Sequence, residues 1–206
     1  MVNNISECSC IAEEHVIEKL KHKYCAGNVI PFVGAGLSTV FQMPSWRELL
    51  RQCQETLNCR KEMNDEWMAQ FEKCAGDFQY REAADILERE YGTDALKETV
   101  AELLKRGGAD RKPLSDLWEI TDNNYKDLAE GEQFKWFFTT NYEGSLAHFI
   151  KGNFESYSLG HDKPNMQEIF QANGKRCLFY LHGNCDNPES IVLTSKDIFT
   201  ERQEHL

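Results

Sequence analysis

The sequence lacks the long apolar run that a membrane-spanning helix needs. None of its 206 residues falls in a stretch approaching the ~20 apolar residues required to cross a bilayer. The first ten residues hold neither a basic start nor an apolar centre, so they are not typical of a secretory signal. From both absences we expect a cytoplasmic protein without a membrane partner.

The sequence also has fewer basic than acidic residues. Lysine and arginine number 23 against 34 aspartates and glutamates, which gives a formal net charge of −11. Nonspecific binding to nucleic acid needs clustered lysine and arginine, so we expect no direct nucleic-acid partner. The charge does not exclude a small anionic ligand held by backbone N–H groups. Hydrophobic residues make up 41% of the chain, which is enough for a folded core.

The eight cysteines lack a regular spacing, and no Cys-x-x-Cys pair occurs among them. This pattern predicts reduced thiols, many of them buried as small apolar side chains. A zinc site built from Cys8, Cys10 and His15 is an alternative, although Cys-x-Cys is not the usual spacing of zinc ligands.

Strands separated by helices are predicted from the apolar patterning. An amphipathic helix is expected over residues 12–25, and Ser45 has the capping-box spacing to Glu48 that begins another helix. A further helix is expected from 143 to about 150. Strands are predicted at 29–33, 135–140, 154–157 and 176–181, with one more at 191–193. The alternation indicates an α/β, Rossmann-like fold with a mainly parallel sheet.

Convincing strand signals are missing between residues 45 and 132. Helices are expected there at 79–91 and 93–106, with Gly107 and Gly108 breaking the second. We interpret residues 45–130 as a helical insertion between the first two core strands. The whole chain, 1–206, is then a single domain.

A glycine pair follows the first predicted strand, in Gly34-Ala35-Gly36. A strand that feeds such a turn can present backbone N–H groups to a phosphate. Neither common nucleotide motif is complete, because the third glycine of the dinucleotide fingerprint would fall at Thr39 and no Gly-Lys-Ser/Thr follows. Taken alone, the turn is as compatible with a plain connection between strand and helix as it is with a phosphate-binding site.

Polar groups follow two further apolar strands, in Thr139-Thr140-Asn141-Tyr142-Glu143 and in Leu181-His182-Gly183. Ligand sites of open α/β sheets form at the carboxyl ends of strands. Asn141 could instead cap a helix, and His182 could be an ordinary turn or core histidine. Three such groups at three strand ends favour a ligand site.

Together these motifs resemble those of the sirtuin superfamily. The likeness is nearer to the sirtuin-like NAD-hydrolysing domains of antiphage defence proteins, which carry a Pro-x-Trp after the glycine turn, as in Pro44-Ser45-Trp46. The resemblance implies a sirtuin-like core that takes NAD+ as its substrate and needs no metal. It also implies Asn141 beside the nicotinamide ribose and a water, and His182 as the catalytic base. The NAD-binding residues that it implies are Gly34, Ala35, Gly36, Ser38, Thr140 and Glu143.

The resemblance implies hydrolysis of NAD+ to nicotinamide and ADP-ribose, in the effector module of a defence or cell-death system. Two alternatives stay open. One is an NAD-dependent protein deacylase, against which count the single cysteine, Cys185, after His182-Gly183 and the altered stretch around Trp46. The other is a sensor that binds NAD+ or ADP-ribose without turnover, because Glu143 stands where the family has aspartate.

Family members continue past the point that matches Ile198. We therefore expect that the C-terminal part of the family domain is missing here. We also expect the chain to act as a homo-oligomer or together with further domains of a longer protein.

Overall fold

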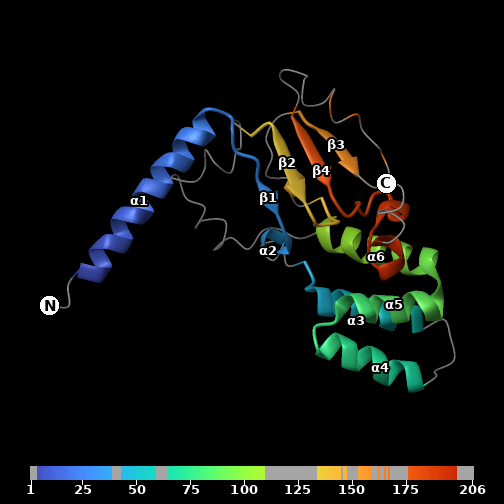
Figure 1. Ribbon diagram of the computed structural model, residues 1–206. Coiled ribbons are helices and arrows are strands. Elements are labelled where there is room, and N and C mark those ends of the chain that lie inside the picture. The colour runs from blue at the N-terminus through green and yellow to red at the C-terminus, as the bar shows by residue number, and fades with distance from the viewer. Residues whose placement is uncertain are drawn as a thin grey trace.

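A computed structural model describes residues 4–38, 43–58, 65–109, 134–144, 146–147, 153–158, 162, 165, 167 and 176–198. In this part of the chain a parallel sheet forms the centre, and helices α3 to α6 lie beyond the carboxyl ends of its strands (Figure 1). None of the described helices is both long enough and apolar enough to cross a membrane.

The sheet contains β1 (Phe32–Val33), β2 (Trp136–Thr139), β3 (Glu155–Ser158) and β4 (Cys177–Tyr180). Its order is β1-β2-β4-β3, and every neighbouring pair is parallel. The predicted α/β class with a parallel, Rossmann-like sheet is therefore confirmed.

Aromatic side chains explain why these short segments form a stable sheet. All of β4 is buried, as its run Cys-Leu-Phe-Tyr suggests for a strand covered on both faces. On one face Phe179 stacks between Phe138 of β2, at 4.9 Å between ring centroids, and Tyr157 of β3, at 5.6 Å. On the other face Phe137 packs with Leu178 and with residues that follow helix α1.

Helix α1 (Asn4–Cys25) begins earlier than the predicted 12–25 and ends before Gly27, whose φ of 67° suits the residue after a helix. Tyr24 contacts the sheet through an edge-on approach to Phe134, at 4.9 Å. The amphipathic pattern of residues 12–25 places Val16, Ile17, Leu20 and Tyr24 near one helical face, but the first three are exposed in the structure. Figure 1 shows why, since α1 extends away from the sheet.

In the middle of the chain, the described residues from 46 to 109 form helices and the short connections between them. The helices are α3 (Trp46–Asn58), α4 (Asp65–Gly76), α5 (Tyr80–Tyr91) and α6 (Thr93–Ala109). The Ser45 hydroxyl accepts the Glu48 N–H at 3.3 Å, so the predicted cap is confirmed. Residues 110–133 lie outside the described part, and the proposed domain and insertion bounds stay predictions.

The predicted break at Gly107 and Gly108 is wrong, because α6 continues through both to Ala109. A glycine within a helix costs only about 1 kcal/mol relative to alanine. Burial of Leu96, Val100 and Leu104 along α6 offsets that cost.

Two predicted strands differ from the structure. The first was expected over 29–33 but holds only Phe32 and Val33, since Pro31 has no N–H to donate to the ladder. Residues 191–193 form no strand, because the Val192 N–H donates to the His182 carbonyl and the Leu193 N–H to Asp197. Of the helix expected from 143, residues 143–144 are not helical, 146–147 are, and the rest lies outside the described residues.

Candidate active site

Three neighbouring strands end level with one another. Val33 of β1 pairs with Thr139 of β2, and Thr139 pairs with Tyr180 of β4. Beyond this row, two residues further along each chain segment, come Ala35, Asn141 and His182. The parallel register thus brings together groups that are widely separated in the sequence.

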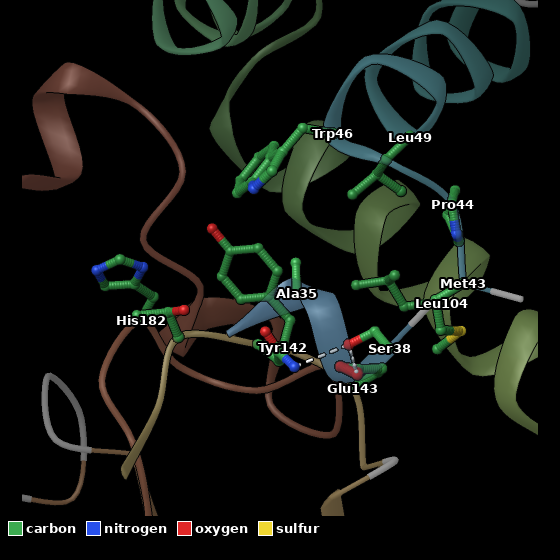
Figure 2. A pocket seen from close by; sticks show the side chains of 12 residues that line it. Ala35, Ser38, Met43, Pro44, Trp46, Leu49, Leu104, Tyr142, Glu143 and His182 are labelled. Carbon is green, nitrogen blue, oxygen red and sulfur yellow. Dashed lines mark hydrogen bonds between the residues drawn. The ribbon is translucent and has the colours of Figure 1, made fainter. Parts of the chain in front are cut away.

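A pocket of about 210 Å³ opens at this edge of the sheet (Figure 2). Helices α3 and α6 form its apolar wall, while the segments after β1, β2 and β4 form its polar side. Its lining residues are Ala35, Ser38, Met43, Pro44, Trp46, Leu49, Leu104, Thr140, Asn141, Tyr142, Glu143 and His182. Pockets for drug-sized ligands span about 300–1,000 Å³, so this one has room for one portion of a larger ligand.

Asn141 is buried and held in one orientation. Its side-chain amide donates to Ser38 Oγ at 2.8 Å and to the Gly34 carbonyl at 3.2 Å. Its backbone N–H donates to Thr139 Oγ1 at 3.1 Å, and that hydroxyl donates to the Val33 carbonyl at 3.0 Å. Its Oδ1 accepts no hydrogen bond from any described residue, which leaves this oxygen for a ligand or a water.

Ser38 and Glu143 form a pair beside Asn141. The Ser38 hydroxyl donates to Glu143 Oε1 at 2.5 Å, and Glu143 is only 4% exposed (Figure 2). The hydroxyl proton of Ser38 is therefore committed to a carboxylate, and a phosphate could receive it only if this bond broke. The pair orients Asn141, a role that the sequence did not indicate.

His182 lies at the exposed rim of the pocket, on the loop after β4. Partial burial and, second, the positive charge of Arg81 lower the pKa of His182 below its usual value. The neutral imidazole is the form that accepts a proton, so both effects favour a base at neutral pH.

Gly183 fixes the course of this loop. Its φ of 78° is a left-handed conformation, and a Cβ added there would lie 2.0 Å from the Ser190 carbonyl oxygen. Only glycine fits, which gives His182-Gly183 a structural reason to occur as a unit.

Trp46 and Tyr142 form an aromatic wall that the predicted site did not include. Their rings meet edge to face at 5.7 Å, and the Tyr142 hydroxyl donates to the Val192 carbonyl at 2.8 Å. Burial raises the pKa of Tyr142, so the phenol keeps its proton. Both residues stood within the quoted motifs, whereas Leu104 of α6 carried no sequence signal.

Most residues named from the sequence meet at this pocket: Ala35, Ser38, Thr140, Asn141, Glu143 and His182 line it. Gly34 and Gly36 do not. Neither has a positive φ, and residues 35–38 form the short helix α2 (Ala35–Ser38) in place of the expected glycine turn. A Cβ at Gly36 would meet nothing within 4 Å. The functional roles of all eight residues stay predictions.

Metal ligands do not gather in the described part of the chain, where no group of histidine, cysteine, aspartate or glutamate could hold an ion. The side chains of Cys8 and Cys10 lie outside it. Free thiols are seen at Cys25, Cys53, Cys74, Cys177 and Cys185.

Comparison with known families supplies an independent indication. Residues 135–206 match the family described as the SIR2-like domain, a stretch that begins just before β2 and contains both Asn141 and His182. No curated protein matches the chain. A SIR2-like domain indicates an NAD-related activity in an NAD-using enzyme family. The similarity of this chain to the SIR2-like domain family therefore rests on residues 135–206.

Proposed function

We propose that this chain hydrolyses NAD+ to nicotinamide and ADP-ribose. The observation that carries the proposal is the convergence of Asn141 and His182 on one pocket at the carboxyl edge of a parallel sheet. Both residues belong to the stretch with SIR2-like sequence. Ligands of open α/β folds bind at this edge.

The proposed hydrolysis needs only a few groups from the protein, because nicotinamide is a good leaving group. The bond between ribose C1′ and the nicotinamide nitrogen breaks, and its electron pair neutralises the departing nicotinamide. Water then attacks the oxocarbenium-like ribose, and the neutral imidazole of His182 takes the water's proton. Asn141, held by Ser38, offers Oδ1 to orient the ribose or the water.

The pocket suits the nicotinamide–ribose half of the dinucleotide. Met43, Leu49 and Leu104 supply apolar surface that excludes bulk water around the reacting bond. The volume of about 210 Å³ leaves the pyrophosphate outside. Backbone N–H groups near Gly34 and Gly36, where no side chain intervenes, are the expected contact for that pyrophosphate.

The test is incubation with NAD+, with and without an acetylated peptide, while nicotinamide and ADP-ribose are measured. Release of both products without peptide supports hydrolysis, and His182→Ala should abolish most of it. His22→Ala, on α1, is the matched control and should leave the rate unchanged. Nicotinamide release that requires the peptide would instead support a deacylase. Binding of NAD+ without release would support a sensor.

A role as the effector of a defence or cell-death system is the biological part of the proposal, and it rests on the likeness of the motifs to such domains. Expression of the wild-type chain should deplete cellular NAD+ and arrest growth under the activating condition. Expression of His182→Ala should do neither. Equal growth arrest by both proteins would contradict this role.

A further inference from the structure

A second pocket of about 180 Å³ adjoins the first. The two pockets share Trp46, Tyr142 and His182 in their linings. The residues that line the second pocket alone are Tyr80, Arg81, Val192, Leu193 and Ile198. The proposed hydrolysis assigns none of these five side chains a contact with NAD+.

The lining of this second pocket combines aromatic and aliphatic surface with one guanidinium. Trp46, Tyr80 and Tyr142 supply the rings, and no carboxylate is among the lining residues. An aromatic pocket without carboxylates suits a ligand with a flat apolar body, because rings stack on one another or meet edge to face.

Arg81 is the feature that gives the pocket its charge preference. It makes no ion pair or hydrogen bond with any residue in the part of the chain that the structure describes, whereas Arg51 pairs with Glu72 and Arg89 with Glu90. The Arg81 side chain is exposed, so a ligand can reach its guanidinium. Its planar donors match a carboxylate or a phosphate.

We propose that the second pocket binds a small aromatic anion, with its ring packed against the Trp46, Tyr80 and Tyr142 side chains and its anionic group on Arg81. The anionic group is a carboxylate or a phosphate. Because His182 lines both pockets, an occupant here excludes water from one side of its imidazole. The resulting change in NAD+ turnover rests on the proposed function, whereas binding of the anion does not.

The experiment is isothermal titration calorimetry on the full chain without NAD+, using benzoate, phenyl phosphate and the neutral benzamide as probes. We expect at least one anion to bind about tenfold or more tightly than benzamide. Arg81→Gln should weaken binding of that anion by about ten- to a hundredfold, as expected for a charge-assisted hydrogen bond, and leave benzamide unaffected. Arg81→Lys should restore part of the affinity, and Arg89→Gln, on the same helix, should match the wild type.

Two further variants locate the bound anion. Tyr80→Ala alters only the second pocket and should weaken binding, whereas Leu104→Ala alters only the first and should not. Thermal melts establish that each variant is folded. Equal affinity for all three probes, no binding of either anion, or loss on Leu104→Ala alone would overturn the proposal. Each of these results is read without NAD+, so an absence of hydrolysis leaves the conclusion on binding intact.

Discussion

At the scale of single residues, the protonation state of His182 decides whether the proposed reaction proceeds, because only the neutral imidazole can accept the proton of the attacking water. Positioned acid–base groups contribute about 10²–10⁴-fold in rate. His182→Ala should lower kcat for NAD+ hydrolysis by about that factor and leave NAD+ binding unchanged. Asn141→Ala should cost a comparable factor because the ribose and the water lose their orientation. Parent-like hydrolysis by both folded variants would rule out the mechanism.

The pH dependence of the rate should follow the lowered pKa of His182. The rate is expected to fall as the pH drops through the pKa of His182, which lies below 6.5, the usual pKa of histidine. Arg81→Gln removes one cause of the shift, so the acid limb of kcat/KM should move to higher pH. The exposed Arg89→Gln is the control, and an unmoved limb in Arg81→Gln would contradict the electrostatic link.

Ser38 is expected to act through Asn141. Ser38→Ala removes one of the two acceptors of the Asn141 amide and leaves the buried Glu143 without the hydroxyl that donates to it. Loss of such a hydrogen bond costs about 1–3 kcal/mol, and a misplaced Asn141 should lower kcat more than it raises KM. Steady-state kinetics and a denaturant titration check both effects. Ser156→Ala, an exposed position on β3, should change neither.

Alanine substitutions at two glycines should have opposite outcomes for the stability of the fold. Gly183→Ala adds a Cβ at a positive φ against the Ser190 carbonyl and should destabilise the fold by at least about 2 kcal/mol. Gly36→Ala meets only open space within α2 and should leave the melting temperature unchanged. Gly36→Val should weaken NAD+ binding because its branched side chain blocks the pyrophosphate from the backbone. Thermal melts separate the first pair, and NAD+ titration tests the third.

At the scale of elements, two polar contacts tie the SIR2-like region to the helices. Asp85 of α5 accepts hydrogen bonds from the Ser195 N–H and hydroxyl, at 2.8 and 2.7 Å. Lys97 of α6 pairs with Asp197 at 2.7 Å, and both side chains are largely buried. Asp197 also accepts the N–H groups of Leu193 and Thr194. These contacts fix the segment whose Val192 bonds to both His182 and Tyr142.

Breaking the Lys97–Asp197 pair should therefore destabilise the fold and disturb the pocket. Burial opposes the charge of Asp197, but the hydrogen bonds from Lys97 and the two backbone N–H groups outweigh it and lower its pKa. The carboxylate thus stabilises the fold at neutral pH, and its contribution disappears only as the pH falls through the lowered pKa. Asp197→Asn should cost about 3 kcal/mol at pH 7, measured by denaturant unfolding. The exposed pair Lys105–Asp186 is the control, and Lys105→Gln should cost under about 1 kcal/mol.

At the scale of the whole molecule, the described residues leave some apolar side chains exposed and one edge of strand β1 without a neighbouring strand. Phe32 on the edge strand β1 and Val16, Ile17 and Leu20 on α1 are all exposed. Exposed edges and apolar stripes recruit other chains, so we expect a homo-oligomer whose assembly supports activity. Light scattering coupled to gel filtration measures this. A stable monomer with full NAD+ hydrolysis would contradict it.

The sequence by itself determined the chemical inventory and most of the local structure. Apolar runs marked β2 and β4, Ser45 marked the start of α3, and Asn141 and His182 stood out because each follows an apolar strand. These features depend on residues that are close together in the chain, so hydrophobic periodicity and capping motifs are enough to predict them. The continuation of α6 through Gly107 was not readable, since it depends on burial against other helices.

Only the tertiary structure decided how these parts meet. The level row of Val33, Thr139 and Tyr180 sets the strand ends side by side, and register of this kind arises from pairing between distant segments. The bond from Ser38 to Glu143 joins residues 105 positions apart. Leu104 reaches the pocket only because α6 packs beyond the strand ends. Local sequence patterns carry no record of such contacts, because burial and hydrogen-bond partners are settled only when the elements pack together.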